Sequence, residues 1–184
     1  MNNKIIAILS FILGLAMMIL AFPNGFSAVF LVILFSGITI FIIRSKTDSE
    51  ETDLLIKIFL VGLIARLFFG LIIEFFELRG FFGGDANTYT RIGDKLANIW
   101  TGQLSSDILT LRDTSRINSG SRGMYYFTAA IFTIFGKNTF AAQSLCAVFG
   151  AATAPLIYVC AKNIYNNSKV AKYSAYLVAL FPAM

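Results

Sequence analysis

The chain has 184 residues, of which 57% are hydrophobic and only 14% are charged, and its mean hydropathy is +0.75. Soluble domains carry roughly 25% charged residues, so this composition indicates a membrane protein rather than an ordinary soluble enzyme. The chain has no histidine, which excludes catalysis by histidine and zinc ligation by histidine. Its net charge is +5, but its basic residues form no stripe with interleaved aromatics, so we expect no nucleic-acid partner.

Two uncharged runs of 18 residues, 5–22 and 26–43, open the chain. At about 1.5 Å rise per residue, each is long enough to cross a hydrocarbon core of about 30 Å. A cleaved signal peptide is the alternative for residues 1–22, although no small-x-small cleavage site follows them. We expect a hairpin of two membrane helices that turns at Pro23-Asn24-Gly25 and, with the polar connector 44–53, forms an amino-terminal domain over residues 1–53.

Two further apolar runs, 54–76 and 139–161, are predicted to be membrane helices, and the first carries Arg66 near its middle. A charged side chain at that depth costs roughly 2.5–3.5 kcal/mol on insertion scales, so it usually faces the bundle interior and finds a partner. Glu77 lies near Arg66 around the helix, with Glu74 somewhat farther. A structural ion pair or a snorkelling arginine is therefore the plain interpretation of Arg66, and substrate binding is the functional one.

The polar loop 79–124 is much longer than the usual 2 to 8 residues between packed helices, and such loops are usually functional. Within it, the apolar residues of 86–100 recur at the spacing of an amphipathic helix. We expect that helix to lie along the membrane surface with Trp100 at the headgroups. Asp85, placed directly behind two glycines, is then either its N-cap or a functional carboxylate that acts as a general base or a cation ligand.

The apolar stretch 125–136 has only twelve residues, about 18 Å as a helix, which favours an interfacial or re-entrant helix over a span. The outer loop then covers residues 79–138. Arg122, just before this stretch, is suited to a lipid-side phosphate or to simple headgroup anchoring.

The short connectors set the predicted orientation. With the amino terminus in the cytoplasm, Arg44, Lys46 and the lysines of the connector 162–172 all lie inside, as the positive-inside rule requires. The loop 79–138 then lies outside. If residues 125–136 spanned the membrane, everything after them would be inverted.

The stretches "GGDANTYTRIGDKLANIWTGQ" and, after a polar gap, "GMYYFTAAIFTIFGKN" and the apolar runs that follow resemble the membrane-embedded GT-C glycosyltransferases. That superfamily includes protein O-mannosyltransferases and bacterial aminoarabinose and undecaprenyl-phosphate-sugar transferases, and the resemblance covers roughly residues 54–184. It implies an all-α, polytopic membrane fold in which 54–184 is the amino-terminal part of the catalytic domain. It also implies an outer loop of juxtamembrane amphipathic helices with an acidic active-site residue, and a polyprenyl-phosphate sugar as donor.

Asp85 matches the catalytic acid of that family, and Tyr89 matches an aromatic residue commonly found just after it. Arg122, Tyr125 and Arg66 complete the candidate substrate site. This chain departs from many members at Ala86, where they carry a second acid, and at residues 121–124, where they carry a His-Pro-Pro-like stretch. No metal ligand is assigned, since a divalent cation is compatible with the sequence but not required by it.

The expected function is transfer of a sugar from a polyprenyl-phosphate donor to a hydroxyl of a protein, lipid or glycan, on the outer face of the cell membrane. A transporter or flippase, which would predict paired repeats and discontinuous spans, and a non-catalytic membrane scaffold are the alternatives. The last apolar run, 173–184, has twelve residues where a span needs about 20. We therefore expect the chain to be an amino-terminal fragment that is inactive alone.

Overall fold

The computed structural model describes residues 12–16, 18–20, 25–47, 49–76, 78, 84–118, 120 and 122–181. These residues form helices and turns, with no strand among them, so the predicted all-α class is confirmed for this part of the chain. Three helices are long and apolar enough to cross a membrane: α2 (Gly25–Lys46), α3 (Ser49–Phe75, from Glu51 on) and α8 (Thr139–Tyr165). The predicted first span and most of its turn, 5–24, lie largely outside the described residues.

The chain divides into two compact units. Residues 1–72 and 143–184 form the first, called here the bundle, and residues 73–142 form the second, called here the crossed-helix unit. The bundle therefore draws helices from both predicted domains, 1–53 and 54–184, whose boundary stays a prediction.

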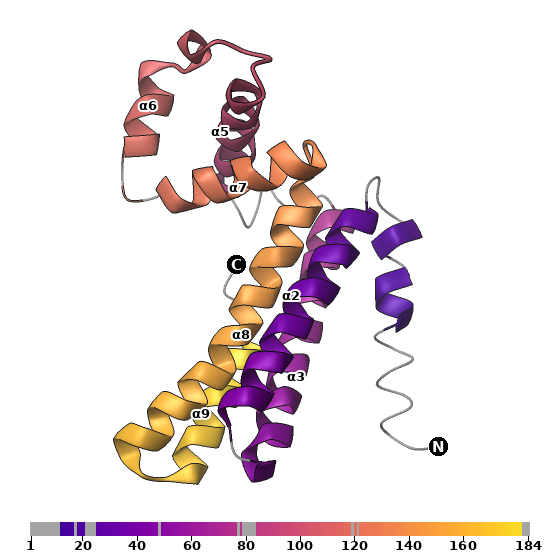
Figure 1. Ribbon diagram of the computed structural model, residues 1–184, viewed down its shortest axis with the longest axis vertical. Helices are drawn as coiled ribbons and strands as arrows, with labels where there is room; N and C mark the ends of the chain where they lie inside the picture. The colour runs from indigo at the N-terminus through magenta and orange to yellow at the C-terminus, as the bar shows by residue number, and fades with distance from the viewer. Residues whose placement is uncertain are drawn as a thin grey trace. The chain divides into compact units, whose positions relative to one another are not determined.

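Helices α2, α3 and α8 lie side by side in the bundle (Figure 1). Phe35 of α2 packs edge-on against Phe149 of α8, with ring centroids 5.6 Å apart. Helix α9 (Ser168–Leu180) buries three alanines spaced four residues apart, Ala171, Ala175 and Ala179. Small side chains on one face let a helix approach its neighbours closely, which is how membrane helices commonly pack.

A two-residue turn joins α8 to α9. Asn166 adopts a left-handed φ of 47°, and the side chain of Asn167 accepts hydrogen bonds from the N–H groups of Lys169 and Val170. Asparagine suits both positions, since it tolerates positive φ and is a strong N-cap. The short basic connector predicted over 162–172 is largely helical: α8 continues to Tyr165 and α9 begins at Ser168, because only Asn166 and Asn167 form the turn.

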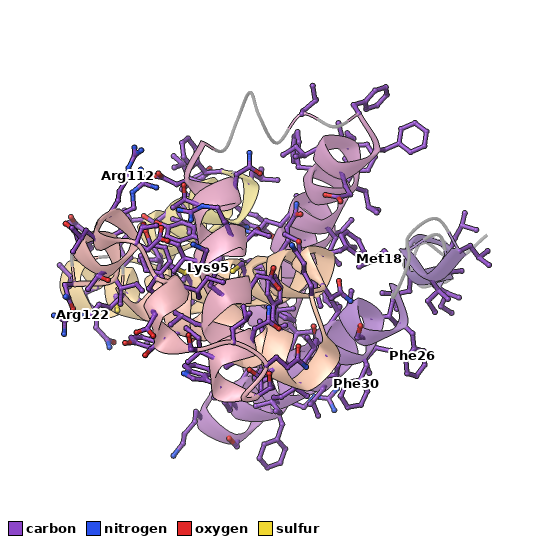
Figure 2. The ribbon with its side chains drawn as sticks, turned by 90° about the horizontal axis from the view of Figure 1, so that it is seen from above. Met18, Phe26, Phe30, Lys95, Arg112 and Arg122 are labelled. Carbon is purple, nitrogen blue, oxygen red and sulfur yellow. The ribbon has the colours of Figure 1, made fainter. Side chains whose placement is uncertain are left out.

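The outward faces of the bundle carry large apolar side chains. Phe26 and Phe30 project outward from α2 (Figure 2), and Phe26 is 72% exposed. Other exposed examples are Phe41, Phe68, Leu156 and Ile164. Exposed apolar surface of this extent is typical of a face that contacts lipid or another protein.

The crossed-helix unit is built on α5 (Gly84–Trp100), which packs against α7 (Arg122–Phe135). The short helices η1 (Ser106–Ile108) and α6 (Leu111–Asn118) lie between them in the chain, and Figure 1 shows α7 running across α5. Their shared core consists of Ile92, Leu96, Ile117, Tyr125 and Ala129.

The helix predicted over 86–100 is confirmed and begins two residues earlier, at Gly84. Its apolar stripe, however, does not need the membrane as a partner. Ile92 and Leu96 are buried inside the protein, in the core shared with α6 and α7. A sequence pattern shows that one face of a helix is apolar, but it does not show whether lipid or protein covers that face. The predicted contact of this stripe with the membrane surface could therefore not be distinguished from packing inside the protein.

Candidate functional site

Asp85 lies in the first turn of α5, because the helix begins at Gly84 rather than at Ala86. The residue is exposed. A carboxylate in this position is stabilised by the partial positive charge of the helix amino terminus, typically by about 0.3–1 kcal/mol. Asp85 is thus a solvent-accessible carboxylate in the first turn of the helix, and the expected N-cap position one residue before the helix is corrected.

Tyr89 lies one turn after Asp85, at the i+4 position that shares its face of α5. Its ring contacts that of Tyr125 on α7, with centroids 5.1 Å apart and planes inclined at 56°. Tyr125 is buried in the core of the unit, whereas Tyr89 is only partly buried. The contact therefore fixes the beginning of α5 on α7, and Tyr89 is the more exposed of the two rings.

Arg122 is the first residue of α7 and lies one turn before Tyr125. It is exposed, and its guanidinium donates a long hydrogen bond of 3.4 Å to the carbonyl oxygen of Asn118. Figure 2 shows Arg122 pointing outward at the edge of its unit. A guanidinium held this loosely retains donors for a phosphate or carboxylate.

Arg66 belongs to the bundle, whereas the other four candidates belong to the crossed-helix unit. Its side chain is buried, and its guanidinium donates to four backbone carbonyls, those of Gly62, Val178, Ala179 and Phe181. Backbone carbonyl oxygens are thus the partners of Arg66, where the sequence predicted an ion pair with a glutamate or a side chain that snorkels to water. Substrate binding by Arg66 stays a prediction, and its four bonds give the residue a structural role.

Asp113 was not singled out from the sequence, yet it is the most buried carboxylate that the structure describes, with its side chain 1% exposed. The Arg91 guanidinium lies 2.7 Å from one carboxylate oxygen and the Lys95 ammonium 2.8 Å from the other. The hydrogen bond from Arg91, joined by those from Lys95 and Thr110, lowers the pKa of Asp113 far below its usual range. Asp113 is therefore a firmly ionised structural anchor and not a proton acceptor for catalysis.

Thr110 and Asp113 also start α6. The Asp113 N–H donates to the hydroxyl of Thr110, and the Thr110 N–H donates to the carboxylate of Asp113. This reciprocal pair is a capping box with aspartate in the position usually held by glutamate. No helix is predicted from the sequence between residues 101 and 124, and the Thr-x-x-Asp spacing is the pattern that indicates this one.

The residues Phe135-Gly136-Lys137-Asn138, which end the stretch "GMYYFTAAIFTIFGKN" of the family resemblance, have a structural explanation. Gly136 ends α7 with a left-handed φ of 72°, the conformation that favours glycine after a helix. Asn138 precedes α8, and its side-chain oxygen accepts the N–H of Ala141, which makes it the N-cap. Between them, Lys137 pairs with Asp94 of α5 at 2.9 Å. The motif therefore reads as the junction of two helices.

Among the described residues, no group of three or more Cys, Asp or Glu side chains lies close enough together to hold a metal ion. Comparisons of the chain with protein-family models, with curated proteins and with solved structures give no match. The function is therefore argued from the geometry above together with the residue patterns.

Proposed function

We propose that this chain is part of a polytopic cell-membrane glycosyltransferase that uses a polyprenyl-phosphate sugar and has its active site on the extracytoplasmic side. The observation that carries the proposal is the place of Asp85. It is an exposed carboxylate at a helix start, in a unit whose two ends lead directly into the apolar helices α3 and α8. A unit tethered in this way stays at the membrane surface, where a donor with a polyprenyl tail presents its sugar phosphate.

Asp85 acts in this proposal as the general base. The acceptor hydroxyl oxygen attacks the anomeric carbon while its proton passes to the Asp85 carboxylate. The bond between the anomeric carbon and the phosphate oxygen breaks, and polyprenyl phosphate leaves with the bonding electrons. Because phosphate is a tolerable leaving group, one positioned base can suffice, and such a base typically contributes 10²- to 10⁴-fold.

The neighbouring side chains support this assignment. Tyr89, one turn from Asp85, offers a partly open ring beside the reacting sugar, and Tyr125 holds that ring in place. Arg122 lies one turn from Tyr125 and retains donors for the donor phosphate. Arg66 is left out of this proposed site because its guanidinium is bound to backbone carbonyls in the bundle.

The first prediction tests the base. In the native full-length protein, Asp85→Asn should fold and insert normally, since asparagine is well tolerated at helix starts. Sugar transfer in proteoliposomes should fall at least 100-fold, the low end of the range for a general base. Asp107→Asn, at an exposed carboxylate of η1, is the matched control and should keep wild-type turnover. Near-normal transfer by Asp85→Asn would return Asp85 to a purely structural role.

A transporter or flippase is the second candidate, and one observation favours it. Helix α9 ends at Leu180, and the buried Arg66 of α3 binds its last carbonyl groups. In transporters, helix ends inside the membrane commonly form the binding site. Under this alternative, vesicles containing the protein would translocate a lipid-linked or soluble substrate without any transfer. Asp85→Asn would then leave transport unchanged, while Arg66→Met would abolish it.

A further inference from the structure

We infer that α9 ends inside the membrane, and that Arg66 serves as a built-in cation at the carboxyl end of this helix. This inference goes beyond the proposed chemistry and rests only on the part of the proposed function that places the bundle in a bilayer. It is carried by the length of α9, by the way the helix ends, and by the contacts of the guanidinium.

The length of α9 places its end at membrane depth. Glu51 near the start of α3 pairs with Lys162 near the end of α8 at 2.6 Å, so α9, which follows α8 after two residues, starts at that same end of the bundle. Its 13 residues rise about 20 Å, against a hydrocarbon core of about 30 Å. Arg66 lies about 22 Å along α3 from Glu51 by the same rise, which matches the end of α9.

The end of α9 is encoded in the sequence. Pro182 disfavours the helical conformation of the residue before it, and Phe181 is indeed extended, with φ −76° and ψ 111°. The last carbonyls of a helix have no partners within it. In hydrocarbon, such groups must be satisfied by the protein itself.

Arg66 supplies the missing donors. One terminal nitrogen, Nη1, lies 2.7 Å from the carbonyl oxygen of Ala179, and the other, Nη2, lies 3.0 Å from that of Val178 and 3.1 Å from that of Phe181. The carboxyl end of a helix carries about half a negative charge. The helix end and the guanidinium therefore neutralise each other, which explains how a charge can lie buried here without a carboxylate among its hydrogen-bond partners.

Two glycines make room for this contact. A Cβ at Gly150 of α8 would lie 2.8 Å from Nε of Arg66. A Cβ at Gly62 would lie 3.3 Å from Nη1 and 3.4 Å from the Cα of Ala179. Three helices thus contribute small residues or carbonyls around one side chain, which indicates a built site and not an accidental approach.

The site resembles in its chemistry the broken helices of transporters, whose carboxyl ends coordinate a bound cation. In this chain the cation is tethered to α3 and cannot leave. Arg66 is therefore a positioning residue: it holds the end of α9 at a fixed depth in the bundle.

The second prediction tests the contact by hydrogen exchange of the full chain in nanodiscs. Arg66→Met should raise exchange over residues 173–181 at least tenfold and leave α2 unchanged. Gly150→Ala should have the same local effect, because the new Cβ displaces the guanidinium. Gly37→Ala is the control, since a Cβ there meets nothing within 4 Å.

The double variant separates this mechanism from general loosening. If Gly150 acts through Arg66, adding Gly150→Ala to Arg66→Met should cause no further increase in exchange. Wild-type exchange in Arg66→Met, or additive effects in the double variant, would overturn the inference. Should Arg66→Met fail to insert, Arg66→Lys replaces it, because a single ammonium cannot reproduce the planar fork of donors.

Depth is measured separately with single cysteines in a background that lacks Cys146 and Cys160. A membrane-impermeant maleimide should label Ser168→Cys from one side and Leu180→Cys from neither side of intact vesicles. Labelling of Leu180→Cys from bulk water would place the helix end at the surface and overturn the inference. Neither measurement uses sugar transfer, so its failure and that of the proposed function can be told apart.

Discussion

Asp113 joins two helices of the crossed-helix unit through one carboxylate. Its partners Arg91 and Lys95 lie one turn apart on α5, while Asp113 itself belongs to the first turn of α6. Cations at i and i+4 of one helix face the same way, so a single acid can bind both. This side chain therefore sets the position of α6 on α5.

The third prediction follows from that arrangement. Asp113→Asn should destabilise the crossed-helix unit by about 1–3 kcal/mol, less than the 3–5 kcal/mol for breaking a fully buried pair, because Arg91 and Lys95 remain partly hydrated. Hydrogen exchange over residues 111–118 should report the loss. Asp107→Asn should leave it unchanged, and equal protection of α6 in both variants would argue against the anchor role.

The pH dependence of this anchor has a definite sign. The pKa of Asp113 is lowered on folding, so its contribution to stability is fully present above its unfolded pKa of about 3.9 and is lost as the pH falls toward the lower folded pKa. As the fourth prediction, α6 protection should be constant between about pH 5 and 8 and fall below about pH 4. In Asp113→Asn this acid-dependent step should be missing, which separates it from the titration of other carboxylates.

At the scale of single residues, sequence patterns singled out Asp85 as a candidate, and Tyr89 and Tyr125 were proposed beside it. Neither could show that the two tyrosine rings touch, because that contact depends on how two separate helices cross. The partners of Arg66 could not be predicted either. They are backbone carbonyls, which every residue type has, so no side chain in the sequence indicates them.

At the scale of elements, the lengths of apolar runs located the long helices, and periodicity gave the start of α5 to within two residues. It missed α6, whose eight residues bury only Asp113 and Ile117 and so carry no apolar repeat. It also could not find the close approach of α5 and α7 at Gly93. A Cβ there would lie 2.7 Å from Cγ2 and 2.9 Å from Cβ of the buried Thr128.

The fifth prediction concerns this crossing. Gly93→Ala should destabilise the crossed-helix unit by about 1–3 kcal/mol, the usual cost of overpacking, even though alanine is the better helix former. Hydrogen exchange over α5 and α7 measures the effect. Gly123→Ala in α7 is the control, because nothing lies within 4 Å of its added Cβ. A neutral Gly93→Ala would mean that the two helices can separate without loss.

At the scale of the whole molecule, the number and length of apolar runs gave the three long helices, but sidedness was argued only from lysine and arginine positions. Helix α7 is not among the candidate spans, and α8 is the one candidate between residues 138 and 166. In the cysteine-free background, Ser105→Cys and Ser168→Cys should therefore be labelled from opposite sides of the membrane. Labelling of both from one side would overturn the predicted topology.

The contact between Arg66 and α9 also has a consequence for synthesis. The guanidinium precedes the carbonyls of Val178 and Phe181 by 112 and 115 residues. At roughly 5–20 residues per second, α3 leaves the ribosome several seconds or more before its partner exists. During that interval Arg66 lies in the bilayer without these partners, and inserting such a charge costs roughly 2.5–3.5 kcal/mol. Nascent chains that stop before residue 168 should consequently hold α3 in the bilayer less firmly than chains that include α9.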